Sequence, residues 1–273
     1  MTGPRAQGGL PTSPMTMSDS HHACAALVHK GDPDRFLAVM AAPPAKRPGL
    51  FALYAFNLEI ARAPWITQEP LLAQMRLQFW RDVVSGEGPP THEIAPALMT
   101  LKADMGLDPA LLAAMIDARE VEIGTKAPFE TADHLWRYLE DSAGGVLMLA
   151  VQALGGGTPE SWPAVRDLGA AQGLANYLLA VPALENAGRM PLPDGRAQAV
   201  AALAQDGLTR LKRARAGLGA VPKAARPALL AAWQAKPLLA QAVRDPGRVA
   251  DGRLAMSEFR RRGGLLLASL TGP

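Results

Sequence analysis

Apolar residues recur every three or four positions along much of the chain, a spacing that places them on one face of an α-helix. Three runs show it clearly: Tyr54, Leu58, Ala61 and Trp65; Leu71, Met75, Phe79 and Val83; and Leu111, Met115, Ala118 and Glu122. Runs of β-branched residues are rare, and strand-like alternation of apolar and polar residues never extends beyond a few positions. The pattern therefore predicts an all-α protein.

Proline and glycine cluster at five places that interrupt these helical runs. The five are Pro43–Pro44, Gly86–Pro90, Gly155–Pro159, Pro191–Gly195 and Pro222–Pro227. Because none is long or polar enough to be a domain linker, we predict a single domain of about ten helices over residues 18–273. Residues 1–17 are rich in glycine and proline, and we predict a disordered leader there.

Composition excludes several classes of protein. The 273 residues are 49% hydrophobic, and their formal net charge of +3 is interpreted as a small excess of arginine spread along the chain. Since dense basic patches interleaved with aromatic residues are missing, nucleic acid is not expected as a partner. The single cysteine, Cys24, permits neither an internal disulfide nor a cysteine-based zinc site. Apolar stretches such as residues 146–154 are too short to cross a bilayer, so no transmembrane segment is predicted.

Five motifs follow one another in a recognisable order and spacing. They are LYAFNLEIARAPW at 53–65, MRLQFWRD at 75–82 after Glu69–Pro70, IDAREVE at 116–122, YLEDSAGG at 138–145, and LGAAQGLAN at 168–176, which runs on to GRMPLP at 188–193. Together they resemble the squalene/phytoene synthase family over roughly residues 32–270. The resemblance implies a single-domain isoprenoid-synthase (terpenoid synthase-like) fold, whose helices surround a central cavity that holds prenyl diphosphates in active members.

The resemblance also implies two aspartate-rich motifs that bind Mg²⁺, because carboxylates four residues apart on a helix can share a hard cation. The matching positions here hold Ala61 and Trp65 in the first motif and Ala180 and Leu184 in the second. Neither pair offers a carboxylate, and Pro182 is expected to kink or end the second helix. We therefore expect no metal site and no cofactor. Mg²⁺ is expected as a cofactor only under the alternative in which the chain is an active synthase.

The AFNxEIA pattern of residues 55–61 resembles a non-catalytic branch of the family, which includes mitochondrial assembly factors for respiratory complex I. This resemblance implies a pseudoenzyme that binds a complex I subunit or assembly intermediate. The composition, rich in alanine, glycine and arginine, suggests a bacterial source, and so a location in the cytoplasm or peripheral to the inner membrane.

Ten residues are candidates for the lining of the former active cavity: Tyr54, Asn57, Ala61, Trp65, Arg76, Trp80, Tyr138, Asn176, Ala180 and Leu184. By spacing, the first four share one helix face. Either this face forms an apolar pocket for a lipid-like tail or a partner helix, or Trp65 fills the space and the face is core. Arg76 is either a remnant of diphosphate binding or stacks on Trp80 one turn later.

Two other functions remain open. One is a true head-to-head prenyl diphosphate synthase that uses displaced acids, namely Glu59, Glu120, Glu122, Glu140, Asp141 or Glu185. The other is a prenyl-lipid carrier. Near the end of the chain, three arginines at 260–262 precede an apolar run that is expected to pack on the domain. A membrane-surface role for this segment is also open, although Gly263–Gly264 weakens a continuous helix.

Overall fold

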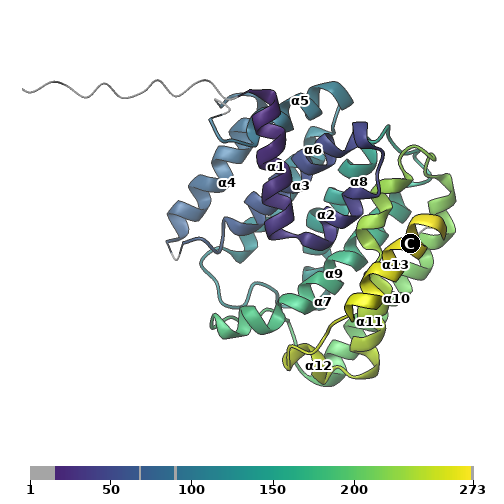
Figure 1. Ribbon diagram of the computed structural model, residues 1–273. Coiled ribbons are helices and arrows are strands. Elements are labelled where there is room, and N and C mark those ends of the chain that lie inside the picture. Colours follow the sequence, from purple (N-terminus) through teal and green to yellow (C-terminus); the bar gives the residue numbers. More distant parts are fainter. Residues whose placement is uncertain (1–15, 68, 89–90, 272–273) are drawn as a thin grey trace, which may run out of the picture.

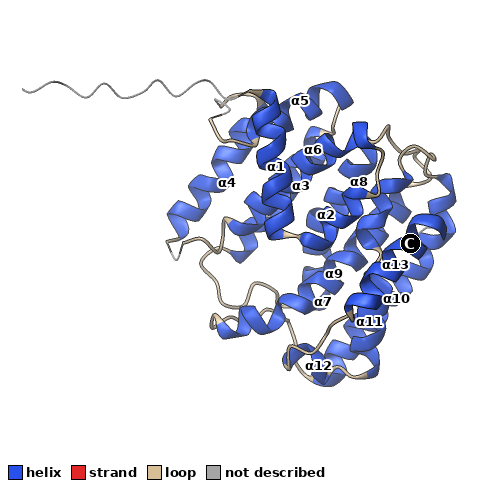
Figure 2. Ribbon diagram, in the orientation of Figure 1, coloured by secondary structure: helices blue, strands red, loops and turns tan. Residues whose placement is uncertain are grey.

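The computed structural model describes residues 16–67, 69–88 and 91–271, and every structural statement below concerns these residues. They contain helices and loops and no strand (Figure 2), so the all-α prediction is confirmed. Almost all of the predicted leader lies outside the described residues. Its last residues are described: Thr16 caps the first helix through a hydrogen bond to the Asp19 amide, and Met17 begins that helix.

Thirteen α-helices follow one another. They are α1 (Met17–Gly31), α2 (Pro33–Met40), α3 (Arg47–Arg62), α4 (Pro70–Ser85), α5 (Ala95–Met105), α6 (Pro109–Asp117), α7 (Ala132–Leu139), α8 (Gly145–Ala153), α9 (Trp162–Asn186), α10 (Ala197–Gly217), α11 (Ala235–Arg244), α12 (Gly247–Ala250) and α13 (Glu258–Thr271). The count exceeds the predicted ten because periodicity does not detect a helix as short as the four-residue α12.

Tighter or wider helical turns connect several of these helices. They are η1 (Pro44–Lys46), η2 (Ala118–Glu122), the π-helical η3 (Glu140–Gly144), η4 (Leu218–Ala220) and η5 (Arg226–Ala232). The five proline and glycine clusters all fall between consecutive α-helices, as predicted. At the end of α4, for example, Gly86 adopts a φ of 86°, a left-handed conformation that costs glycine little and stops the helix.

Helix α9 is the central element of the domain. It contacts α8 and η3 as well as α10 and α11, and it lies between the N-terminal helices and the C-terminal ones (Figure 1). Its buried residues, from Ala164 to Val181, lie on all sides, as expected of a helix enclosed by others. Pro182 was expected to kink or end this helix, and it does not end it. Pro182 is four residues from the end at Asn186, where the loss of one backbone hydrogen bond is tolerated.

The last helix, α13, lies on the outside of the domain at its C-terminal side (Figure 1). Gly263–Gly264 does not interrupt it, because Gly264 is where the helix meets the domain: a side chain there would contact the Trp233 ring at 3.2 Å. Arg261 also forms an ion pair with Asp34 of α2. Along the described residues, every helix is too short or too polar to cross a membrane.

Candidate functional site

A cavity of about 360 Å³ lies between the ends of several helices, and we call it the inter-helix cavity. Its walls come from the start of α2, the end of α3, η2, α7, η3, the start of α8 and the second half of α9. The lining residues are Asp32, Arg35, Asn57, Leu58, Ala61, Trp65, Arg119, Glu122, Tyr138, Leu139, Ser142, Ala143, Val146, Gln172, Gly173, Asn176, Tyr177, Ala180 and Leu184. Its volume is at the small end of the range for cavities that bind small molecules.

One wall depends on a close approach between α9 and the π-helical turn η3. Two glycines of α9 make this approach feasible. A Cβ at Gly173 would lie only 2.4 Å from the Ala143 Cβ, and one at Gly169 would lie 2.8 Å from the Ala143 carbonyl oxygen. Within η3, the Ser142 hydroxyl donates to the Tyr138 carbonyl at 2.6 Å. The glycines therefore hold η3 against α9, and η3 carries Ser142 and Ala143 into the cavity wall.

A buried polar cluster forms the floor of the cavity. The Tyr138 hydroxyl donates to Glu122 Oε2 at 2.9 Å, and an Arg119 guanidinium nitrogen donates to the Tyr138 hydroxyl oxygen. The same guanidinium lies 3.8 Å from Glu122 Oε2 and donates a long, 3.5 Å hydrogen bond to Asn57 Oδ1. These four side chains connect η2, α3 and α7 with one another.

Burial shifts the proton equilibria of this cluster. It raises the pKa of Glu122 above its ordinary value, although Arg119 and the Tyr138 hydroxyl act in the opposite direction. Burial likewise holds the pKa of Tyr138 well above its ordinary value, so Tyr138 stays protonated and acts as a donor. The only carboxylate of the cluster is thus surrounded by donors that it already uses.

Arg35 forms a second charged group in the lining. Its guanidinium lies 4.9 Å from the centre of the Tyr54 ring and 3.5 Å from Asp32, whose carboxylate also caps α2 through the Arg35 amide. The Nε atoms of Arg35 and Arg119 are buried and have no hydrogen-bond partner among the described residues. Both guanidinium groups are nevertheless held within the protein, Arg35 by Asp32 and Arg119 by Tyr138 and Glu122.

Arg189 closes one edge of the cavity. Its guanidinium stacks on the indole of Trp65 at 3.8 Å and donates to the Glu122 carbonyl at 2.8 Å and the Pro64 carbonyl at 3.4 Å. Arg189, which lies after α9, thereby connects two other segments: the turn that follows α3 and the end of η2.

The structure brings seven of the ten sequence candidates together in the lining: Asn57, Ala61, Trp65, Tyr138, Asn176, Ala180 and Leu184. The spacing predicted that Trp65 shares a helix face with Tyr54, and this prediction is wrong. α3 ends at Arg62, shortly before Pro64, which has no N–H to donate to the Ile60 carbonyl. Trp65 reaches the cavity from the turn that follows.

Three candidates lie elsewhere. Tyr54 is core beneath Arg35, and burial raises its pKa to about 12. Trp80 is buried and packs edge-on against Phe56 at 5.4 Å, not under Arg76. Arg76 is exposed on α4, so the expected stacking of Arg76 on Trp80 is wrong. Arg76 and Trp80 lie on α4, and no residue of α4 lines the inter-helix cavity.

Several lining residues were not among the sequence candidates. Arg35 lies in none of the five motifs, and Gln172 lies within the LGAAQGLAN motif but was not singled out. Arg189, from the GRMPLP segment, does not line the cavity but stacks on its lining residue Trp65. Arg119 and Glu122 both lie in the IDAREVE motif, and Glu122 was named among the displaced acids. The signal that could have marked them is the IDAREVE motif itself, since it follows in order with the other four motifs.

The donors of this cavity do not fit the Mg²⁺ that the family resemblance implies. Its two lining carboxylates, Asp32 and Glu122, are already hydrogen-bonded to α2 and to Tyr138. No group of three or more metal-ligating side chains occurs among residues 16–67, 69–88 and 91–271. Hydrocarbon from Ala61, Ala180 and Leu184 occupies the positions at which paired carboxylates were expected.

The arrangement defines an all-helical prenyl-synthase-like domain whose cavity lacks paired carboxylates. Solved structures agree with this fold. A dehydrosqualene synthase in complex with ligand matches with a TM-score of 0.79 and 18% identity, covering 93% of this chain and 96% of the other. Squalene synthase HpnC from Alicyclobacillus acidocaldarius matches with a TM-score of 0.67 and 18% identity, covering 82% and 93%. The sequence model of the squalene/phytoene synthase family matches residues 28–198, and the chain belongs to this family.

Curated relatives point to one branch. The chain is 30% identical over 164 residues to "NADH dehydrogenase (ubiquinone) complex I, assembly factor 6" of Homo sapiens, covering 59% of this chain and 49% of the relative. It is 34% identical over 179 residues to the Drosophila melanogaster homolog, covering 62% and 52%. The matched stretch spans about half the length of these relatives. The predicted resemblance to the family and to this branch is thus confirmed.

Proposed function

We propose that this protein is a complex I assembly factor, a non-catalytic member of the squalene/phytoene synthase family that binds a subunit or assembly intermediate of respiratory complex I. The observation that carries the proposal is its similarity to the curated assembly factors of Homo sapiens and Drosophila melanogaster, at 30% and 34% identity.

The chemistry of the cavity supports this proposal. A synthase needs paired carboxylates to hold the metal that draws off diphosphate. Ala61 and Ala180 present methyl groups to this cavity instead, while Glu122 is held by Tyr138 and Arg119. What remains is a tightly packed helical framework, which is suited to holding a binding surface in a fixed shape.

The experiment is deletion of the gene followed by assay of NADH:quinone oxidoreductase activity in membranes. We expect that activity to fall several-fold and the assembled complex to decrease in native gels, with restoration by the intact gene. Succinate:quinone oxidoreductase activity in the same membranes serves as the control and should not change. Unaltered complex I in the deletion strain would contradict the proposal.

We further propose that the protein works in the bacterial cytoplasm, against the inner membrane, where it meets a membrane-bound assembly intermediate. Crosslinking in intact cells followed by purification of the tagged chain tests this. Complex I subunits should be enriched over those of succinate dehydrogenase. Equal enrichment of both would contradict a specific partner.

Catalysis by displaced acids is the main rival, since the family contains head-to-head synthases. Three of the candidate acids are already engaged in ion pairs: Glu120 with Arg81 at 2.5 Å, Glu140 with Arg210 at 2.6 Å and Asp141 with Arg166 at 2.8 Å. Incubation with farnesyl or geranylgeranyl diphosphate and Mg²⁺ decides the matter. Turnover above a no-protein control would establish the rival function, and we expect none.

A prenyl-lipid carrier is the second alternative function, and the hydrocarbon walls of the inter-helix cavity favour it. Native mass spectrometry of the purified chain tests it. A retained lipid that the substitution Ala180→Trp removes would place the ligand in the inter-helix cavity. Without a retained lipid, the carrier function has no support.

A further inference from the structure

Basic residues are not evenly spread along the chain, contrary to the expectation from composition. Residues 207–273 contain 13 Lys and Arg against 3 Asp and Glu, whereas residues 1–206 contain 15 against 22. The formal charges of the two parts are therefore +10 and −7, and the small net charge of +3 conceals them. A separation of this size identifies the C-terminal part as the region that meets an anionic partner.

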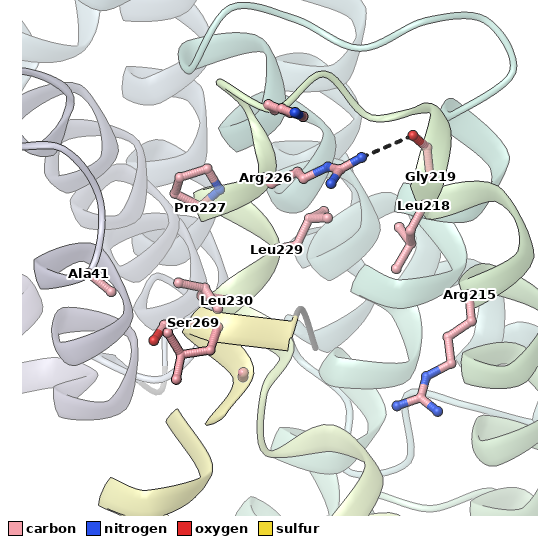
Figure 3. A pocket seen from close by; sticks show the side chains of 12 residues that line it. Ala41, Arg215, Leu218, Gly219, Arg226, Pro227, Leu229, Leu230 and Ser269 are labelled. Atoms are coloured by element: carbon pink, nitrogen blue, oxygen red, sulfur yellow. Dashed lines mark hydrogen bonds between the residues drawn. The ribbon is translucent and has the colours of Figure 1, made fainter. Parts of the chain in front are cut away.

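Three hollows beside α13 collect many of these basic side chains. A hollow of about 790 Å³ is lined by Arg215, Lys223 and Arg226, one of about 520 Å³ by Lys212, Arg215 and Lys236, and one of about 490 Å³ by Arg244, Arg248 and Arg260. No carboxylate lines any of the three. Figure 3 shows the first, where Arg226 donates to the Gly219 carbonyl at 3.2 Å and Arg215 extends at the rim. We call this surface the basic face.

Most of the charges on the basic face are not neutralised within the protein. Elsewhere on α10, Arg210 and Arg213 form ion pairs with Asp167 at 3.2 and 2.5 Å. Among the described residues, no ion pair is formed by Lys212, Arg215, Lys223, Lys236, Arg244 or Arg260. The Nε atom of Arg248 is buried without a hydrogen-bond partner. The face thus presents cationic donors that can bind an outside anion.

Helix α13 adds an apolar stripe to this face. Its domain side is formed by Gly264, Leu265 and Ala268, of which Ala268 is buried and the other two half-buried. On the opposite side, Phe259, Leu266 and Leu270 are 88%, 65% and 78% exposed. Their spacing of seven and four residues places all three on one line along the helix. Arg260 and Arg262 flank this line.

We propose that the basic face binds an anionic phospholipid bilayer, with α13 lying in the plane of the headgroups. In this arrangement Phe259, Leu266 and Leu270 enter the boundary with the acyl chains. Lys and Arg side chains of the three hollows bind the lipid phosphates. A surface that combines exposed hydrocarbon with flanking cations is typical of interfacial helices. This inference deepens the proposed position against the inner membrane by naming the surface that binds it, and vesicle binding tests it separately from the role in complex I assembly.

Two other occupants fit the observations less well. A second copy of the chain would bring two basic faces together, and like charges oppose such a contact. Nucleic acid would satisfy the cations but would leave Phe259, Leu266 and Leu270 against a charged, hydrated backbone. A bilayer accommodates both the charge and the hydrocarbon.

The test is co-sedimentation of the full chain with phosphatidylcholine vesicles, with and without phosphatidylglycerol. We expect binding to the anionic vesicles alone, weakening as salt is added. The variant Leu266→Asp with Leu270→Asp should bind at least about tenfold more weakly, since it removes two exposed leucines. The variant Arg215→Gln, Lys223→Gln and Lys236→Gln should lose roughly fivefold per charge.

Matched control variants carry the same changes far from α13. Leu71→Asp with Met75→Asp alters two exposed apolar residues of α4, and Lys30→Gln, Arg76→Gln and Arg137→Gln removes three exposed charges. Both should bind as the unaltered chain does. Circular dichroism confirms that each variant is folded.

Four outcomes would overturn the proposal. The first is no binding to anionic vesicles, and the second is equal loss of binding in test and control variants. The third is self-association that Leu266→Asp with Leu270→Asp abolishes, without vesicle binding. The fourth is binding of duplex DNA at the same salt concentration, again without vesicle binding.

Discussion

The inter-helix cavity and the basic face both contain basic side chains, but these side chains differ in whether they have partners within the protein. In the cavity, Arg119 meets Glu122 and Tyr138, Arg35 meets Asp32, and Arg189 binds two backbone carbonyls. On the basic face, Lys223 and Lys236 have no carboxylate partner among the described residues. Charge in the cavity is therefore part of the fold, whereas charge on the basic face is directed to a partner. The predictions below test this contrast, beginning with the largest effect.

The same substitution should have very different effects in the two regions. Glu122→Ala leaves the Arg119 guanidinium buried without its carboxylate, which should cost about 3–5 kcal/mol in the free energy of unfolding. Glu258→Ala on α13 removes an exposed partner of Arg261 and Arg262 and should cost less than about 1 kcal/mol. Urea denaturation of both variants measures the difference.

A double variant sharpens this first prediction. Arg119→Met together with Glu122→Leu removes the buried charges as a pair, and it should recover most of the stability that Glu122→Ala loses. If the double variant is as unstable as the single one, packing and not charge determines the stability of this cluster.

The close contact between α9 and η3 gives the next largest effect. Gly173→Ala places a methyl group 2.4 Å from the Ala143 Cβ and should destabilise the fold by about 1–3 kcal/mol. Gly195→Ala is the matched control, since no atom lies within 4 Å of the added group. Thermal unfolding should separate the two variants clearly. Equal melting temperatures would mean that η3 can move away from α9 at little cost.

The titration of Glu122 should give a smaller effect. Burial raises its folded-state pKa above the ordinary value of 4.5, so protonation favours the folded state. The contribution is fully present below pH 4.5 and is lost as the pH rises through the raised folded pKa. The stability of the unaltered chain relative to Glu122→Gln should therefore fall with rising pH and then level off. A relative stability that rises instead would show that Arg119 and Tyr138 outweigh burial.

Neutralising the basic face should have the smallest effect on folding. Arg215→Gln, Lys223→Gln and Lys236→Gln should change the free energy of unfolding by no more than about 0.5 kcal/mol each, because these side chains are exposed and have no partner to lose. A larger loss, measured by urea denaturation, would mean that these charges support the fold after all.

The sequence was sufficient for the fold class and the family because both depend on features that are local in the chain. Helical spacing in runs such as residues 71–83 and five motifs in order need no tertiary information. Helix ends were harder to predict. α3 ends at Arg62 before Pro64, whereas α9 continues for four residues beyond Pro182 to Asn186.

The composition of the site depends on contacts that sequence does not reveal. Arg35 and Glu122 line one cavity from positions 87 residues apart, and Arg189 binds the Glu122 carbonyl from a third segment. Arg76 and Trp80 have the spacing of a stacked pair, yet the ring turns into the core while the guanidinium stays in water. The charge separation could have been counted from the sequence, but its meaning required the hollows that flank α13.

A molecule with +10 in its last quarter and −7 in the rest is a strong electric dipole. In the field of an anionic surface such a dipole rotates before contact, so the protein approaches with α13 toward the surface and the acidic part away from it. Encounters would then begin in one orientation, and whatever the protein binds next would be presented with the same outward side each time.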